Sequence, residues 1–248
     1  MLVTNGCSFV WGDELEGFME GEHEHLTFTH HLADHLGIEY RNISSCGNCN
    51  TKIFRDTINE MEHNHEITHM VIIWSAWQRD EVAESHPPNY EEEMKIQRFQ
   101  CMTQISPSRL HFTHKKLKKV LDPFYDVVNV ERNGIMHTLT YMHAIKLLCD
   151  AKGIKLIQGG FHERMWVNYL DIFTKKMNKG KNWGAFNKYV KERMESLPDH
   201  HRVGFGKYTD MFTLARTKYS IKPFGHPDED THTEFAHLLD HIFRTTKW

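Results

Sequence analysis

A continuous apolar run from Met70 to Trp74 constrains the fold more than any other feature of this sequence. A strand that is apolar at every position has both faces buried, which is typical of a central strand in a parallel sheet. Shorter apolar segments at 2–7, 38–43 and 154–157 are separated from this run by segments with helical spacing. Strands that alternate with helices form βαβ units, so the sequence predicts an α/β fold with a central parallel sheet.

Helical spacing recurs in several segments, and some of them end at a glycine, as helices commonly do. These segments are 26–36, 53–61, 135–151 and 235–243. We expect residues 219–224 to add a fifth strand, and 81–130 to form a polar, partly helical insertion without a strong strand. Because no linker or repeat interrupts the pattern, residues 1–248 are interpreted as one domain.

The composition is that of an ordinary globular protein, with a formal net charge of -3. No apolar segment is long enough to span a membrane or to act as a signal peptide. The five cysteines lack the spacing of a disulfide framework, which favours a reducing, cytoplasmic location. Two basic runs, 115–119 and 175–181, are more typical of solvated surfaces on a chain of this charge, so neither a membrane nor a nucleic-acid partner is expected.

Ser8 follows the first apolar segment, where the predicted strand gives way to a helix. Ligands gather at the carboxyl ends of the strands in such sheets. A serine there can present its hydroxyl as a nucleophile, while nearby backbone N–H groups stabilise an oxyanion. The alternative is that Ser8 only caps the helix.

Two later loops strengthen the catalytic interpretation. Gly47 and Asn50 follow the second predicted strand, and an unobstructed glycine N–H and an amide side chain are the donors that an oxyanion needs. A turn with Asn50 as a helix cap is the alternative. His226 stands just before the last helix, where a general base could reach the serine. Pro227 and the acidic residues after it would also suit a simple helix start.

Taken in this order, the three loops resemble the SGNH (GDSL-type) hydrolases. Gly6-Cys7-Ser8 resembles the family's first block, and Gly47-Asn48-Cys49-Asn50 resembles the Gly-x-Ser-Asn version of compact, often phage-encoded relatives. His226-Pro227 resembles the late block. The resemblance implies a flavodoxin-like, three-layer α/β/α domain and an ester hydrolase without a metal or other cofactor. Ser8 would be the nucleophile, His226 the base, and Gly47 and Asn50 the oxyanion donors.

Two blocks depart from the family pattern. Pro223 occupies the place of the family's acid, so either a Ser8/His226 dyad acts alone or another acid orients the imidazole. Asp228 is our choice for this acid, with Asp230 and Asp210 as alternatives. The family's Gly-x-Asn-Asp block is replaced by 74–80, in which Arg79 could bind an acidic group of the substrate or pair with a neighbouring carboxylate. His232 competes with His226 as the base, although it is more suited to the core.

The expected function is therefore a serine-dependent esterase of the acylesterase or deacetylase type, acting on a small-molecule or glycan ester. Two alternatives stay open at this point. The departures would also suit an SGNH-like domain that serves as a binding or virion-associated module. The 20 histidines, with i,i+4 pairs such as His31/His35 and His237/His241, raise the alternative of a metal-dependent hydrolase.

Overall fold

The computed structural model describes residues 1–17, 22–77, 80–83, 102–105, 130–160, 183–204, 207–223 and 225–248. Its centre is a four-stranded sheet in the order β2-β1-β3-β6, and every pairing in it is parallel. The predicted parallel α/β fold is confirmed. The four strands are β1 (Leu2–Asn5), β2 (Tyr40–Asn42), β3 (His69–Trp74) and β6 (Lys155–Gly160).

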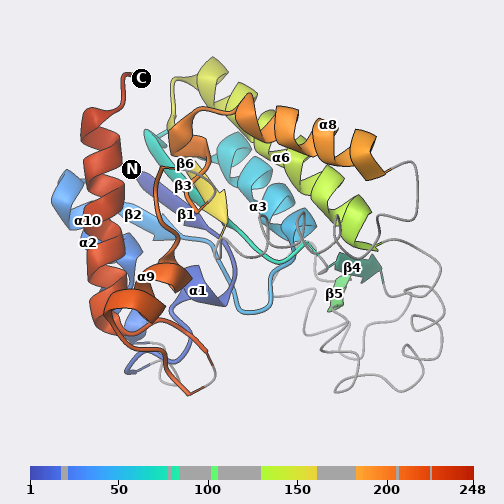
Figure 1. Cartoon of the computed structure of the whole chain (residues 1–248). Helices are drawn as coiled ribbons and strands as arrows, with labels where there is room; N and C mark the ends of the chain where they lie inside the picture. The colour runs from blue at the N-terminus through green and yellow to red at the C-terminus, as the bar shows by residue number, and fades with distance from the viewer. Residues whose placement is uncertain are drawn as a thin grey trace.

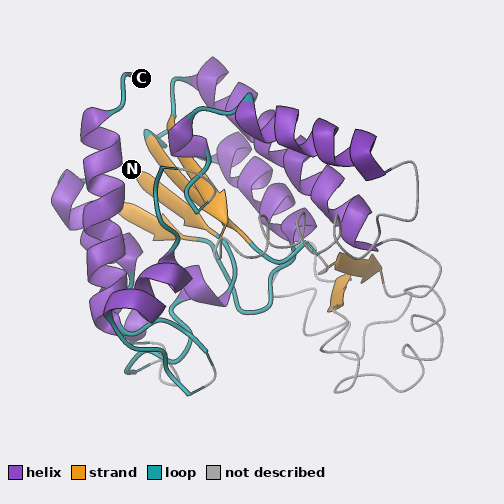
Figure 2. Cartoon of the chain, in the orientation of Figure 1, coloured by secondary structure: helices purple, strands orange, loops and turns teal. Residues whose placement is uncertain are grey.

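Helices cover both faces of this sheet, as Figures 1 and 2 show. Residues of β3 alternate between the two layers: Met70, Ile72 and Trp74 join one hydrophobic cluster, and Val71 and Ile73 join the other. The first cluster packs against α3 (Asn50–His63), α6 (Val130–Lys152) and α8 (Trp183–Glu195). The second packs against α2 (Phe28–Leu36), α9 (Met211–Lys218) and α10 (Glu229–Thr245).

Three short helical segments lie between these elements: α1 (Ser8–Trp11), η1 (His23–Leu26) and η3 (Asp199–His201). The predicted end of α2 at Gly37 is confirmed, because this glycine adopts a left-handed conformation with φ of 65° and its N–H bonds back into the helix. None of the helices in the described part of the chain is long and apolar enough to cross a membrane.

The expected fifth strand at 219–224 does not form in the residues described there. Ile221 makes only an isolated antiparallel bridge to Pro227, because the chain turns back on itself at this point. The Lys222 N–H donates to the His226 carbonyl at 2.8 Å, and the Gly225 N–H donates to the Lys222 carbonyl at 2.9 Å. Residues 219–223 therefore form one side of a tight loop rather than a strand of the sheet.

The region 81–130 also differs from the expectation. Two short strands, β4 (Asp80–Ala83) and β5 (Met102–Ile105), pair antiparallel at its edge, although the sequence showed no strong strand there. The rest of this region and both basic runs lie outside the described residues.

Candidate active site

Ser8 lies at the carboxyl end of β1, on the first residue of α1. Cys7 is the N-cap residue of this helix, so Ser8 does not have the capping role that was its alternative interpretation. Gly6 allows the chain to pass close to its neighbours here, because a Cβ at this position would lie 2.3 Å from Val10 Cγ2 and 2.9 Å from the Ile73 carbonyl oxygen. The Ser8 residue itself is only 6% exposed.

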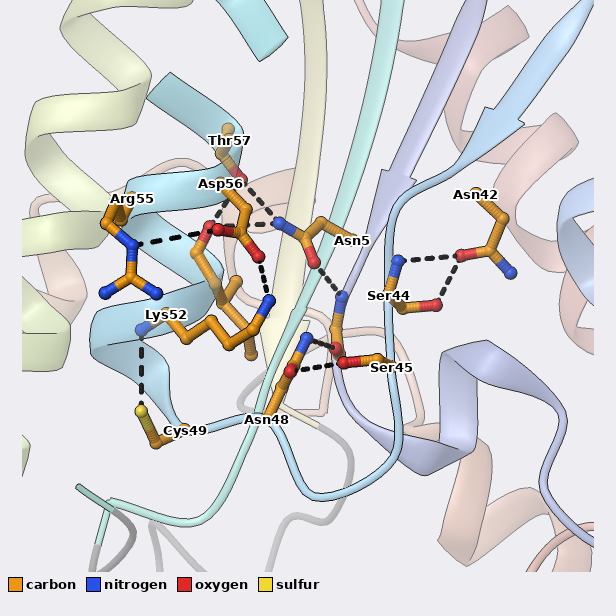
Figure 3. A network of polar contacts seen from close by, with 12 residues as sticks. Asn5, Asn42, Ser44, Ser45, Asn48, Cys49, Lys52, Arg55, Asp56 and Thr57 are labelled. Atoms are coloured by element: carbon orange, nitrogen blue, oxygen red, sulfur yellow. Dashed lines mark hydrogen bonds and ion pairs between the residues drawn. The ribbon is translucent and has the colours of Figure 1, made fainter. Parts of the chain in front are cut away.

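Two buried asparagines hold the backbone just before Ser8 (Figure 3). The Asn5 side chain accepts a hydrogen bond from the Gly6 N–H at 2.8 Å and donates to the Ile53 carbonyl and the Thr57 hydroxyl in α3. The Asn48 amide, in the loop after β2, donates to the Gly6 carbonyl at 2.9 Å. The N–H and the carbonyl of Gly6 are thus held by the side chains of Asn5 and Asn48, which positions Ser8.

His226 reaches Ser8 from the loop before α10. Its Nε2 atom lies 2.9 Å from Ser8 Oγ, within hydrogen-bond distance. The loop is tied at its base by the Asp228 carboxylate, which accepts hydrogen bonds from the N–H and hydroxyl groups of Ser220. The His226 side chain is 15% exposed, so the imidazole is largely shielded from water.

Glu14 contacts the other nitrogen of the same imidazole. Its Oε2 atom lies 2.7 Å from His226 Nδ1 and also accepts from the His226 backbone N–H at 3.2 Å. Gly12, with φ of 88°, ends α1 and turns the chain so that the following residues fold back toward Ser8. Glu14 has φ of 69°, and it is the one non-glycine residue with positive φ in the described part of the chain. Such backbone strain is often found at functional sites.

A second carboxylate lies beside the imidazole. Asp13 Oδ2 is 3.5 Å from His226 Nε2, the nitrogen that faces Ser8. Ser8, His226 and Glu14 are in hydrogen-bond contact, and a serine, a histidine and a carboxylate in such contact form the arrangement that nucleophilic acyl transfer requires.

No protein-family model matches this sequence, and no curated protein matches it. Among solved structures, the chain is similar to a candidate lipolytic protein of the G-D-S-L family from Desulfitobacterium hafniense, with a TM-score of 0.50 and 8% identity over 97% of this chain and 98% of that one. This chain has the G-D-S-L hydrolase fold. A G-D-S-L lipolytic family member from Veillonella parvula gives a TM-score of 0.47 at 9% identity, covering 99% of this chain and 98% of that one.

A carbohydrate esterase family 2 enzyme from Corynascus thermopiles gives a TM-score of 0.49 at 10% identity, covering 97% of this chain and 64% of that one. At 8% identity, the likeness to the Desulfitobacterium hafniense structure shows the fold alone.

Asp228, our predicted acid, is not the carboxylate that lies at His226 Nδ1. Its carboxylate caps α10, where it accepts from the Thr231 N–H at 2.9 Å and from the Thr231 hydroxyl at 2.6 Å. Burial alone would raise the pKa of Asp228, but the hydrogen bonds from Ser220 and Thr231 outweigh it and hold the pKa below its ordinary value. Asp210, an alternative, likewise caps α9. The carboxylate at His226 Nδ1 is Glu14, which the sequence interpretation missed.

Asn50 does not serve as an oxyanion donor in this structure. Both hydrogens of its buried amide are used, one by the Ser75 carbonyl at 3.0 Å and one by the Thr138 hydroxyl at 2.8 Å. Its oxygen accepts from the Ser75 N–H, so Asn50 ties α3 to the end of β3 and to α6. Cys49, rather than Asn50, is the N-cap of α3. Arg79 lies outside the described residues.

Gly47 lies in the loop between β2 and α3, next to Asn48, in a left-handed conformation with φ of 80°. Because Asn48 bonds to the Gly6 carbonyl, this loop is held against the segment that carries Ser8. The geometry keeps the Gly47 backbone as a candidate donor, and its oxyanion role stays a prediction.

His232 lies in the core of the G-D-S-L fold and is only 1% exposed. Its Nδ1 atom accepts from the Phe28 N–H at 3.1 Å, at the beginning of α2. Burial lowers the pKa of His232 to about 3, so its ring is neutral at physiological pH. His232 therefore has a structural position, while His226 is the histidine beside Ser8.

The two histidine pairs that suggested a metal-dependent hydrolase, His31/His35 and His237/His241, lie on α2 and α10. The His35 and His237 rings stack with their centroids 4.6 Å apart. Within the described ranges, no group of three or more histidine, cysteine, aspartate or glutamate side chains could hold a metal ion.

Proposed function

We propose that this protein is a serine ester hydrolase of the acylesterase or deacetylase type, with Ser8 as nucleophile, His226 as general base and Glu14 as the acid that orients it. The observation that supports this most is one continuous line of contacts. Ser8 Oγ lies 2.9 Å from one nitrogen of His226, and Glu14 Oε2 lies 2.7 Å from the other. Two segments that are more than 200 residues apart in the sequence meet there, which a helix cap alone would not require.

The proposed reaction begins when His226 Nε2 takes the Ser8 proton and Oγ attacks the ester carbonyl carbon. The imidazolium that results is stabilised by the Glu14 carboxylate, which also holds the ring with Nε2 toward Ser8. The Ser8 and Gly47 N–H groups are proposed to bind the oxyanion, because the first residue of a helix has an N–H without a partner inside the helix. His226 then passes its proton to the leaving alcohol.

A water molecule completes the proposed cycle. It attacks the acyl–Ser8 ester while His226 takes a proton from it, and the acid is released as Ser8 regains its hydroxyl proton. The products are one carboxylic acid and one alcohol. The substrate class that fits is a small-molecule or glycan ester.

Covalent labelling with a fluorophosphonate tests this proposal without knowledge of the substrate. The wild-type protein should form a phosphonylated adduct at Ser8, and Ser8→Ala should remove the label with little change in melting temperature. Ser196→Ala is a matched control, because this serine lies after α8 and bonds only locally, to the Arg193 carbonyl at 2.8 Å. It should keep the full label.

A second measurement is hydrolysis of p-nitrophenyl acetate by wild type, Ser8→Ala and His226→Ala. Both variants should lose turnover if the proposed roles are right. A folded wild-type protein that takes up no fluorophosphonate would refute the hydrolase assignment and favour a non-catalytic binding module.

A further inference from the structure

Asp13 is not needed by the proposed mechanism, yet its carboxylate lies next to the reacting atoms. Its Oδ2 atom is 3.5 Å from His226 Nε2, which faces Ser8, while Glu14 contacts the far side of the ring. A residue that only oriented the imidazole would contact Nδ1, as Glu14 does. The position of Asp13 is therefore that of a group beside the substrate rather than behind the base.

The place of the leaving group follows from the chemistry at Nε2. This nitrogen delivers a proton to the leaving-group oxygen, so that oxygen must come within about 3 Å of it. Because Asp13 Oδ2 is 3.5 Å from the same nitrogen, the leaving-group oxygen can be no more than roughly 6.5 Å from this carboxylate oxygen. The charge of Asp13 thus acts on the alcohol half of the ester.

The charges around this position do not cancel Asp13. Glu14, the neighbouring residue, is also a carboxylate, but it contacts Nδ1 on the far side of the ring from Ser8. Lys222 belongs to the same loop as His226, but its ammonium group is paired with Glu229 at 3.0 Å. The Asp13 side chain is 24% exposed, so it is open to a ligand while its charge is only partly screened by water.

We propose that Asp13 is a specificity-determining residue that makes this site select esters with a positively charged alcohol portion and disfavour those with an anionic one. The inference rests on the proposed function, since it names the substrate class of the same site. For a unit positive charge roughly 6 Å from a carboxylate in a partly buried site, an effective dielectric constant of about 40 gives roughly a tenfold preference over a neutral group. A negative charge at the same place should be disfavoured by a similar factor.

Three acetate esters of matched shape test this selection. Acetylcholine carries a positive charge, neohexyl acetate is its neutral carbon isostere, and acetoxypropanoate carries a negative charge. Their kcat/KM values can be compared in a pH-stat. Wild type should prefer acetylcholine to neohexyl acetate by about tenfold, and Asp13→Asn should bring this ratio close to one. Glu16→Gln removes a charge from an exposed position in the same loop and should leave the ratio nearly unchanged.

Labelling rates provide the same comparison if ester turnover is slow. A phosphonate with a choline leaving group should modify Ser8 about ten times faster than one with a neohexyl leaving group, and Asp13→Asn should abolish the difference. Equal rates for the two phosphonates in wild type, or a preference that survives in Asp13→Asn, would overturn the role of Asp13 and leave the hydrolase proposal intact. Failure of both phosphonates to label a folded protein would overturn the hydrolase proposal itself.

Discussion

Replacing Glu14 with glutamine removes the negative charge beside His226 and keeps the size of the side chain. In the structure, one Glu14 oxygen accepts from Nδ1 at 2.7 Å and from the His226 backbone N–H at 3.2 Å. When Nε2 takes the Ser8 proton, the imidazole becomes a cation whose Nδ1–H faces this carboxylate. A hydrogen bond to a charged group contributes about 1.5–3 kcal/mol. Because about 1.4 kcal/mol corresponds to a factor of ten, kcat/KM should fall roughly 10- to 100-fold.

Asp228→Asn is the matched control for this experiment, because Asp228 is two residues from His226 and its carboxylate caps α10 instead. It should lower the free energy of unfolding by about 1–2 kcal/mol and change kcat/KM of the folded protein only slightly. The assay is p-nitrophenyl acetate hydrolysis well below both melting temperatures, with urea unfolding to measure stability. If Asp228→Asn lost more activity than Glu14→Gln, Asp228 would be the orienting acid and our assignment of Glu14 would be wrong.

Three further predictions concern stability and reactivity. In the unfolded chain His232 takes up a proton below its ordinary pKa of 6.5, whereas in the folded chain it does so only near pH 3. The contribution of neutral His232 to the free energy of unfolding should therefore be present above pH 6.5 and fall by about 2 kcal/mol by pH 5. Urea unfolding at several pH values should show a shallower pH dependence for His232→Gln. Gly6→Ala should cost about 1–3 kcal/mol, because its methyl group would overlap Val10, and an unchanged urea midpoint would contradict this packing. Burial, with a smaller effect of Asp150, raises the pKa of Cys149 to about 12, so iodoacetamide should leave this thiol unmodified in the native protein, as peptide mass spectrometry can check.

Part of the candidate site could be read from the sequence because each residue is marked by its local surroundings. Ser8 follows an apolar strand, and His226 precedes a strongly amphipathic helix, so both belong to loops at the same edge of a parallel sheet. Their contact in the structure agrees with that expectation. Glu14 was missed, although Pro223 showed that the acid had to come from elsewhere and Glu14 stands in the same loop as Ser8.

The two asparagines show why side-chain roles were harder to predict. Asn48 and Asn50 are two residues apart in the sequence, and the predicted donor near Ser8 was Asn50. The structure directs Asn50 toward Ser75 and Thr138, and Asn48 toward Gly6. Which way an amide points depends on the turn that carries it and on partners far away in the chain, neither of which has a local pattern.

The sequence by itself determined the layered α/β fold, because hydrophobic periodicity depends on neighbouring residues and sets which faces of β3 and α10 are buried. It also determined the end of α2, since Gly37 suits the left-handed conformation there. Only the tertiary structure decided which carboxylate meets His226. Glu14 and His226 are separated by more than 200 residues, and their contact depends on the turn at Gly12 and on the loop in which the Lys222 N–H donates to the His226 carbonyl. Contacts of that kind arise from the packing of the whole chain, so no short segment encodes them.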